Sequence, residues 1–335
     1  MNGQPTNKKR LLATLEYLYK YSDTYHTVTS VDIMEHIQKK YGIEADRRSV
    51  YRDIAALNDF GIDIVKMPSK KEGYYMASKI FEPHEIKLLL DAVLSAPFIT
   101  EKKTEQLRSK LLSMLSTFKA DEIDKQTFLE KRVKLKNEQI YYSIDCINNA
   151  ITQKKKVKFK YHHYKLKGNK ITADKGKEFL LSPYALLWCD DKYYLVGNYE
   201  KYDDVSHYRI DRMSNVRLLD KDIRPYSEVC EYTDCFDTAD YARKSFKMYA
   251  GKPQRIVLLC DNGLFETMLD KFGFDANYKQ ISSTDFTVTA TANISNGLLD
   301  WLISYCDKCR IIAPTELNIM LRNKIDAIKS YINNI

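Results

Sequence analysis

The stretch that decides the fold of the N-terminal region runs from Asp46 to Ile62 and reads DRRSVYRDIAALNDFGI. Asp46 stands where its side chain can accept a hydrogen bond from a free N–H group of a first helical turn. Val50, Ile54 and Leu57 recur at the spacing of one helix face. The stretch therefore predicts a short helix that packs through this apolar face and stops at Gly61.

Three arginines accompany this helix, and their positions admit two interpretations. At about 100° per residue, Arg48 and Arg52 point away from the apolar face, with Tyr51 beside them. Arg47 lies nearer the packed face. The arginines are either an ordinary solvated face or contacts to phosphates and bases, since arginine can donate two hydrogen bonds to one guanine.

The flanking sequence favours the second interpretation. Two further amphipathic helices precede the stretch, in KKRLLATLEYLYKYS and in TVTSVDIMEHIQKKYGI, where Thr29 or Ser30 can cap and Gly42 can stop the helix. After it, IDIVKMPSKKEGYYMA predicts two short strands around a turn that carries Lys70 and Lys71. Three helices and a basic-tipped hairpin are the order of a winged helix-turn-helix, whose third helix enters the major groove.

RRSVYRDIAALNDFGIDIV…GYYM resembles the DNA-binding domain of the WYL-domain transcriptional regulators. The resemblance rests on Arg47 or Arg48, on Arg52 with Asp53, on Gly61-Ile62 and on Gly73-Tyr74. It implies binding to double-stranded operator DNA. Asp53, a carboxylate, is expected to orient a basic side chain instead of reading a base. The predicted DNA-binding residues are Arg47, Arg48, Ser49, Tyr51, Arg52, Lys70 and Lys71.

The next region, residues 81–152, reads as a helical linker. FEPHEIKLLLDAVLSAPFI and TEKKTEQLRSKLLSMLSTF predict two amphipathic helices, the second capped by Thr100, and a further helix covers 137–152. Their leucine-rich faces suit dimerisation and suit packing within the chain equally well.

A basic segment follows the linker. Between Lys154 and Lys177 the sequence contains ten lysines and one acidic residue, Asp174. Val157, Phe159 and Tyr161 alternate with lysines, which predicts a strand with one apolar and one basic face. Such a strand is either a solvated sheet edge that discourages aggregation or a surface for an anionic ligand, on which rings stack on bases while cations hold phosphates.

Short aromatic strands continue beyond this segment, and there the resemblance appears a second time. Tyr193-Tyr194-Leu195 stands where the Trp-Tyr-Leu tripeptide of WYL domains is expected, with Tyr193 replacing the tryptophan. Glu178 stands near a position where an arginine is usual, and His162 and His163 could compensate for it as local bases. The resemblance implies an SH3- or Sm-like barrel that senses a nucleic-acid or nucleotide-like effector. The predicted ligand-binding residues are Tyr161, His163, Ser182, Tyr194, His207, Arg209 and Arg212, although Asp211 and Arg212 also suit an internal ion pair.

The C-terminal region alternates strands and helices in the order βαββαβ plus a final helix, which predicts a ferredoxin-like domain. We thus expect an α+β multidomain protein. Its predicted parts are a winged helix-turn-helix at 1–80, a helical linker and dimerisation region at 81–152, a WYL barrel at 153–235 and a C-terminal extension domain at 250–335.

Composition and motifs narrow the function classes. The 335 residues carry a formal net charge of +8, which favours acidic partners such as nucleic acid. No signal peptide or membrane-spanning run is found, and the seven scattered cysteines suit reduced thiols, so we expect a cytoplasmic protein without membrane partners. Cys306-x-x-Cys309 has the spacing of half a zinc site, but no matching pair follows.

No phosphate loop, nucleophile elbow or zinc-protease motif occurs, so we expect no enzyme, no catalytic residues, no metal and no cofactor. The favoured function is a ligand-responsive regulator that binds operator DNA as a homodimer. The alternative is an RNA- or single-stranded-DNA-binding accessory protein whose WYL barrel is the main working surface.

Overall fold

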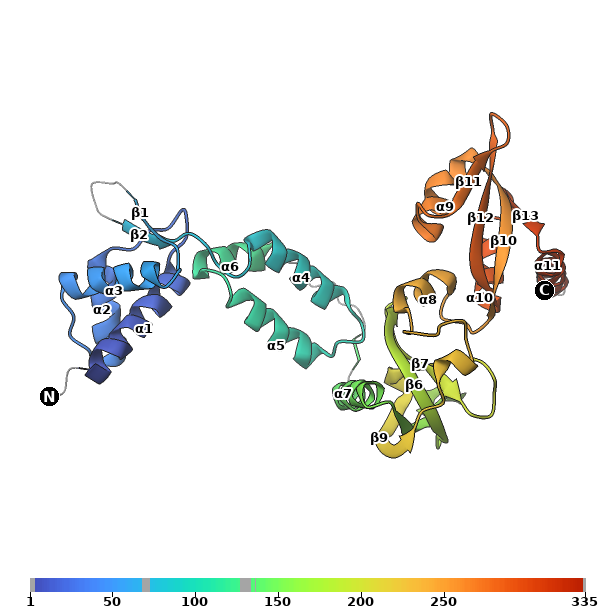
Figure 1. Cartoon of the computed structure of the whole chain (residues 1–335), viewed down its shortest axis with the longest axis horizontal. Helices are drawn as coiled ribbons and strands as arrows, with labels where there is room; N and C mark the ends of the chain where they lie inside the picture. The colour runs from blue at the N-terminus through green and yellow to red at the C-terminus, as the bar shows by residue number, and fades with distance from the viewer. Residues whose placement is uncertain (1–3, 68–72, 127–133, 136, 334–335) are drawn as a thin grey trace. The chain divides into compact units, whose positions relative to one another are not determined.

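A computed structural model gives the structure of residues 4–67, 73–126, 134–135 and 137–333 (Figure 1). The chain divides into two compact units, residues 1–136 and 137–335. Both units combine helices with antiparallel strands, so the protein is a mixed α+β protein with several antiparallel sheets. Over these residues, no helix is both long enough and apolar enough to cross a membrane.

The first unit opens with three helices and a hairpin, in the order expected from the sequence. Their bounds are Gln4–Tyr21 for α1, Ser30–Tyr41 for α2, Arg47–Asp59 for α3, Ile64–Met67 for β1 and Gly73–Met76 for β2. The apolar faces of these elements meet in one core, because each helix has a single apolar stripe that must be buried. Residues at its centre are Leu18, Ile33, Ile37, Val50, Ile54 and Leu57.

The predicted helix ends in this region are confirmed. Thr29, and not Ser30, caps α2 in a capping box with Asp32, and Gly42 ends the helix in the left-handed conformation at φ 65°. The Asp46 side chain caps α3 by accepting a hydrogen bond from the backbone N–H of Ser49 at 2.7 Å. Gly61, at φ 99°, follows the last turn of α3, where a residue with a side chain would be strained.

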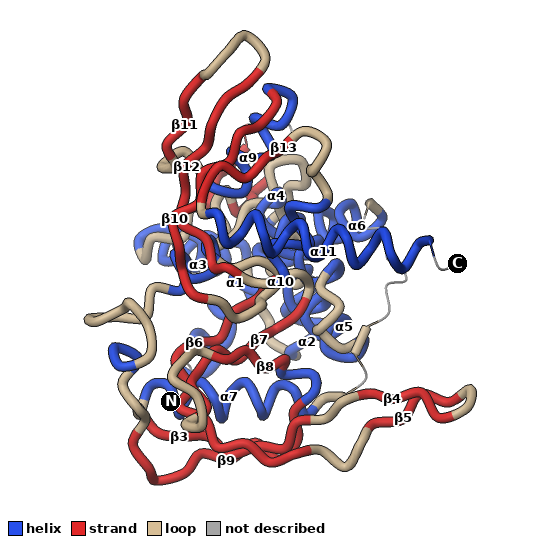
Figure 2. Tube along the Cα trace, turned by 90° about the vertical axis from the view of Figure 1, so that its right-hand side faces the viewer, coloured by secondary structure: helices blue, strands red, loops and turns tan. Residues whose placement is uncertain are grey.

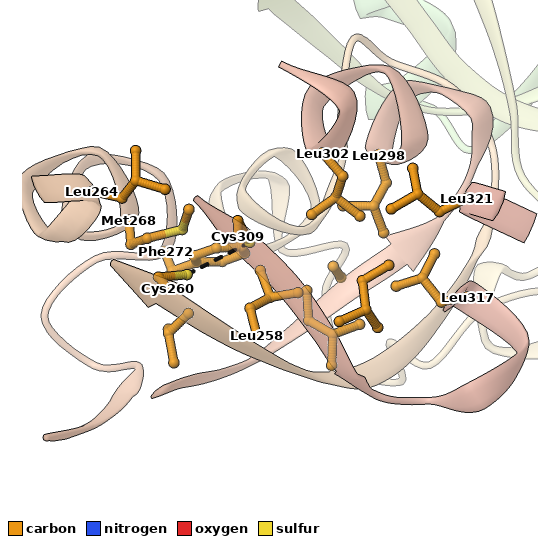
Figure 3. Packing of buried hydrophobic residues seen from close by; sticks show 14 of the residues in the cluster. Leu258, Cys260, Leu264, Met268, Phe272, Leu298, Leu302, Cys309, Leu317 and Leu321 are labelled. Atoms are coloured by element: carbon orange, nitrogen blue, oxygen red, sulfur yellow. Dashed lines mark hydrogen bonds between the residues drawn. The ribbon is translucent and has the colours of Figure 1, made fainter. Parts of the chain in front are cut away.

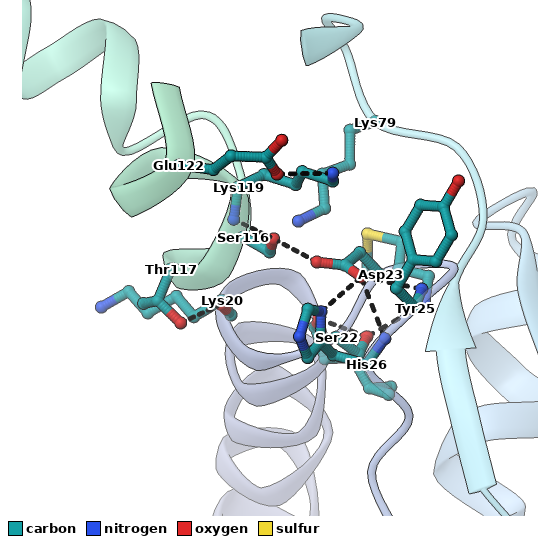
Figure 4. Close-up of polar contacts among 12 residues, drawn as sticks. Lys20, Ser22, Asp23, Tyr25, His26, Lys79, Ser116, Thr117, Lys119 and Glu122 are labelled. Atoms are coloured by element: carbon teal, nitrogen blue, oxygen red, sulfur yellow. Dashed lines mark hydrogen bonds and ion pairs between the residues drawn. The ribbon is translucent and has the colours of Figure 1, made fainter. Parts of the chain in front are cut away.

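Three further helices complete the first unit. They are α4 (Pro83–Ser95), α5 (Glu101–Leu112) and α6 (Thr117–Lys125), which share a small apolar core around Ile86, Leu90 and Ile123. Figure 4 shows how α6 is fastened to the end of α1: the Ser116 hydroxyl donates to the Asp23 carboxylate at 2.6 Å. The Tyr19 hydroxyl donates to the Met114 carbonyl at 2.8 Å. These helices therefore pack within their own chain.

The second unit begins with a helix and a five-stranded antiparallel sheet in the order β8-β7-β6-β3-β9. The elements are α7 (Gln139–Thr152), β3 (Lys155–Tyr161), β6 (Lys177–Cys189), β7 (Lys192–Tyr199), β8 (Ser206–Arg209) and β9 (Met213–Asp222). α7 was expected in the linker, but it packs on β3, β6 and β9. The buried side chains of its inner face, Ile140, Ile147 and Ala150, explain this position, because they need the sheet to cover them.

The strand face expected to be uniformly basic is only partly so. Lys156 is buried and pairs with Glu200, and Lys158 pairs with Glu178 at 3.0 Å. Glu178, which replaces an expected arginine, lies opposite Lys160 on the neighbouring strand. The lysines of β3 are thus neutralised in part by carboxylates from β6 and from the loop after β7, which the sequence of β3 itself does not contain.

A separate two-stranded hairpin, β4 (Tyr164–Lys167) and β5 (Lys170–Ala173), contains several of the lysines from the basic segment. Figure 2 shows it as a ribbon that extends from the strands of this unit. Every one of its eight residues is exposed. Lys165, Lys167 and Lys170 share one face, because Lys167 pairs with Lys170 and Lys165 with Thr172.

The rest of the second unit contains α8 (Thr238–Lys244) and a four-stranded antiparallel sheet in the order β11-β12-β10-β13. The elements of that sheet and its helices are β10 (Lys252–Asp261), α9 (Phe265–Phe272), β11 (Asn277–Gln280), β12 (Asp285–Ile294), α10 (Asn296–Ile303), β13 (Cys309–Ala313) and α11 (Thr315–Asn333). Alternate residues of β10 and β12 face the helices and form a closed core with Met268, Leu302 and Leu317 (Figure 3).

Candidate nucleic-acid interface

The outward face of α3 is a cluster of exposed cations. Arg47, Arg48 and Arg52 are exposed, while Val50, Ile54 and Leu57 on the opposite side are buried. Among the residues that the structure describes, none of the three guanidinium groups has an ion-pair partner, and only Arg52 Nε makes a side-chain bond, to the Arg48 carbonyl at 3.4 Å. Arg47 was expected nearer the packed face; it is exposed because it precedes the first buried turn.

Tyr51 and Ser49, the other two predicted DNA contacts on α3, differ in exposure. Tyr51 is exposed, and its hydroxyl lies 3.5 Å from the Ser30 hydroxyl, which ties α3 to the start of α2. Ser49 is buried, and its hydroxyl donates to the Asp46 carboxylate at 2.7 Å. The Ser49 hydroxyl is thus used within the helix cap, and its role as a DNA contact stays a prediction.

Asp53 has the structural role expected for it. Its carboxylate receives two hydrogen bonds from the Arg10 guanidinium, at 2.8 and 3.1 Å. The side chains of Asp53 and Arg10 are 9% and 13% exposed, respectively. This bidentate pair fastens α3 to α1 and keeps the carboxylate away from the exposed arginine face.

The predicted wing is described only at its base. Lys70 and Lys71 lie outside the described residues. β1 and β2 pair from Ile64↔Met76 to Met67↔Gly73, so the strands of the hairpin end at Met67 and begin again at Gly73. A Cβ atom at Gly73 would lie 2.5 Å from the Thr27 hydroxyl oxygen, so this position requires glycine. The start of β2 at Gly73 therefore lies in close contact with Thr27, in the loop before α2.

The seven predicted ligand-binding residues of the second unit do not form one site. Tyr161 and His163 are in ring contact, with centroids 5.3 Å apart. Tyr194 and Arg209 are opposite one another on β7 and β8. The two pairs meet where the Arg209 backbone N–H donates to the Tyr161 hydroxyl at 3.4 Å.

Arg209 is held in place by a nearby carboxylate. Its Nε and Nη2 atoms donate to Asp211 at 3.0 and 2.6 Å, and this hydrogen bonding raises the pKa of Arg209. The internal ion pair of Asp211 is thus with Arg209, and not with Arg212. The Nε atom of Arg212 is buried and has no partner among the described residues, while the Arg212 carbonyl accepts from the His162 N–H at 2.9 Å.

Two predicted ligand contacts have partners within the protein. Ser182 is fully buried, and its hydroxyl accepts the backbone N–H of Arg224 at 3.0 Å. His207 packs against α8, with Nε2 2.7 Å from the Tyr241 hydroxyl, and burial lowers the pKa of His207 to about 4. Both side chains are thus engaged within the protein, and their role as ligand contacts stays a prediction. The sequence of a short aromatic strand does not show which of its two faces a helix such as α8 will cover.

Lys177 and Phe179 belong beside Tyr161 and were missed. Lys177 lies directly opposite Tyr161 on the neighbouring strand, and its ammonium group lies 5.6 Å from the centroid of the Phe179 ring. Lys177 and His163 are exposed and give this end of the sheet a basic surface, while Phe179 is half-buried and Tyr161 is buried beneath it. The alternation in KEFLL could have shown that Lys177 and Phe179 share one strand face. The strand register that places Lys177 opposite Tyr161 could not be read from the sequence.

The cysteines do not extend this site. Cys306 is exposed, whereas Cys309 is buried with its sulfur 3.6 Å from that of Cys260. In the part of the chain that the structure describes, no group of three or more His, Cys, Asp or Glu side chains is arranged to hold a metal ion.

Comparison with known proteins gives one domain match. Residues 143–218 match the family model of the WYL domain. Among solved structures, the chain is similar to proteasome accessory factor B/C (PafBC) of Arthrobacter aurescens, with 17% identity and a TM-score of 0.28 over 94% of this chain and 46% of that chain. A hypothetical protein solved at 2.2 Å resolution shares 13% identity, with a TM-score of 0.18 over 67% of this chain and 52% of that chain.

The chain thus spans about half the length of both structures. A search of curated proteins found no match. The WYL domain expected around Tyr193-Tyr194-Leu195 is confirmed, and the match starts within α7, in agreement with the packing of that helix on the sheet.

Proposed function

We propose that this WYL-domain protein is a transcriptional regulator that binds double-stranded operator DNA through α3. The observation that carries the proposal is the arginine face of α3, which has no ion-pair partner among the described residues. Arginines elsewhere are either ion-paired, as Arg10, Arg108, Arg209, Arg224 and Arg243 are, or lie apart from one another without an ion pair among the described residues, as Arg255 and Arg310 do. What distinguishes α3 is that three such arginines share one short helix. Three cations left exposed on one short helix favour an anionic partner, because unpaired like charges side by side repel one another.

The arrangement of the first unit supports docking in the major groove. We interpret α1, α2 and α3 with the β1–β2 hairpin as a winged helix-turn-helix, in which the third helix enters the groove. Arg48 and Arg52 lie one helical turn apart, so both can reach the same groove. Ala55 continues their exposed face with a small side chain, which permits close approach.

We further propose that the second unit senses the effector. The five-stranded sheet is interpreted as the SH3- or Sm-like barrel of a WYL domain, and the order β11-β12-β10-β13 as a ferredoxin-like extension. A nucleic-acid or nucleotide-like effector would contact the exposed His163 and Lys177 next to the buried Tyr161, and the His163 ring can stack on a base. Arg209, oriented by Asp211, would donate to a phosphate through its remaining Nη1 atom.

The regulator would bind a palindromic operator as a homodimer, so that each α3 contacts one half-site. An effector that changes operator affinity must then bind with a different affinity when DNA is present, because coupling between two sites is reciprocal.

The test uses duplexes selected from a random pool by the wild-type protein. The variant Arg48→Ala with Arg52→Ala should weaken duplex affinity by about 2 kcal/mol or more, roughly 30-fold, since each bidentate arginine contributes about 1–3 kcal/mol. The slope of log affinity against log salt should also decrease by about 0.9 for each phosphate that the variant no longer neutralises. Lys102→Ala with Lys110→Ala removes two exposed lysines of α5 and is the matched control.

Unchanged duplex affinity in the arginine variant would show that α3 does not bind the DNA. The alternative function, a single-strand-binding accessory protein, is tested with the hairpin lysines. Single-strand binding that disappears on Lys165→Ala, Lys167→Ala and Lys170→Ala together, and persists in the arginine variant, would favour that alternative.

A further inference from the structure

A groove of about 420 Å³ lies between α8 and the C-terminal sheet, and none of the predicted effector residues lines it. Its walls come from the end of α8, from the segment after α9 and from the part of β12 that extends past β11. β11 pairs with β12 only as far as Thr289, so the strand continues beside the groove without a β11 neighbour. The volume falls within the range of about 300–1,000 Å³ that is usual for small-molecule sites.

The cations at the α8 side of the groove already have partners. Arg243 donates to Asp240 at 3.0 Å and lies 3.5 Å from Asp275. Lys244 pairs with Asp240 and Glu231, both at 2.5 Å. This network is fixed further by the Tyr232 hydroxyl, which donates to Asp240 at 2.8 Å. With the two cations Arg243 and Lys244 against three carboxylates, this wall supplies no free positive charge to the groove, which must come from Arg255.

The sheet side of the groove is different. Arg255 is directly opposite Thr291 on the neighbouring strand, and Thr289 lies two residues along on the same face. Among the described residues, the Arg255 guanidinium has no ion-pair partner, and neither threonine hydroxyl has a hydrogen-bond partner. The guanidinium of Arg255 and the hydroxyls of Thr289 and Thr291 thus line one groove from adjacent strands, without a carboxylate paired to them among the described residues.

We infer that this groove binds a small phosphate ester, with its phosphate on Arg255, Thr289 and Thr291. The guanidinium fork can engage two oxygens of a phosphate, as it does in other bidentate pairs. The two hydroxyls then serve the third terminal oxygen, which a carboxylate lacks. Ala276 and Ala290 line the same groove above the buried Phe272 and offer an apolar surface to the organic part of the ligand.

The inference does not depend on DNA binding, and its test uses the full-length protein without DNA. Phenyl phosphate and benzoate are titrated by calorimetry, because the two probes share a ring and differ in their anionic group. Phenyl phosphate should bind saturably and more tightly than benzoate. Arg255→Ala should weaken its binding at least about tenfold, as expected when a charge-assisted bidentate pair is removed.

Two further variants separate a binding role from a folding role. Thr291→Val keeps the shape of the side chain, removes one donor and should weaken binding severalfold. Arg310→Ala is the matched control, because Arg310 is opposite Leu259 on the same face of the sheet but does not line the groove. The inference is overturned if phenyl phosphate does not saturate, if benzoate binds equally well, or if Arg255→Ala binds like the wild type and Arg310→Ala.

Discussion

Replacing Asp53 by alanine should loosen α3 without removing any proposed DNA-binding side chain. The substitution leaves the Arg10 guanidinium, 13% exposed, without the carboxylate that accepts its bonds at 2.8 and 3.1 Å. Removing one partner of a buried pair costs about 3–5 kcal/mol. Arg10 keeps one bond, to the Asn7 side chain at 2.8 Å, so we expect a smaller loss of about 2–3 kcal/mol.

Hydrogen–deuterium exchange of the full-length protein measures this loss locally. In the regime where exchange follows the opening equilibrium, peptides from α1 and α3 should exchange about 30- to 150-fold faster in the variant, since 1.4 kcal/mol corresponds to a factor of ten. Peptides from the second unit should exchange at the wild-type rate.

The matched control is Asp59→Ala on the same helix. Asp59 is exposed and, among the described residues, forms no ion pair, so its replacement should change stability by no more than about 0.5 kcal/mol. Arg10→Met combined with Asp53→Leu should regain most of the protection, because it removes both charges. Equal exchange in Asp53→Ala and Asp59→Ala would refute the role given to the Arg10–Asp53 pair.

Three further predictions concern substitutions at single positions. His207 has a folded-state pKa of about 4, below its ordinary value of about 6.5, so the unfolded state binds the proton first. Stability should therefore fall by up to about 1.4 kcal/mol per unit as pH drops from about 6.5 to about 4, and urea titrations of His207→Gln should show a flatter profile. Gly73→Ala should destabilise the first unit by about 1–3 kcal/mol, because its Cβ would lie 2.5 Å from the Thr27 hydroxyl oxygen; thermal melts that match the wild type would disprove the close approach. Ser182→Ala should cost about 1–3 kcal/mol by leaving the Arg224 N–H unsatisfied, and a variant of wild-type stability that lacked only its effector response would support Ser182 as a ligand-binding residue.

Local signals explain why the first unit could be predicted well. A cap, a helical apolar stripe and a terminal glycine each act within a few residues, so DRRSVYRDIAALNDFGI contains most of what α3 needs. Asp53 was expected to orient a basic residue because a carboxylate is repelled by DNA phosphates, and in the structure it does pair with a basic residue. Only its partner, Arg10, required the fold.

The sequence did not show which side chains are engaged by residues far away in the sequence. Ser182 is bound by Arg224, Lys156 by Glu200, and His207 by Tyr241. Alternation along one strand gives the two faces, but not which face another element covers. The same limit hid Lys177 beside Tyr161.

The sequence by itself determined the helices of the first unit, the direction of Arg48 and Arg52, the WYL domain and the order of strands and helices near the C-terminus, because periodicity, capping and motifs are local properties. Only the tertiary structure decided that α7 packs on the WYL sheet, that Arg209 is bound by Asp211, and that Arg255 meets Thr291 and Thr289 at a groove. Those outcomes depend on strand register and on burial, which bring together groups that no local pattern connects.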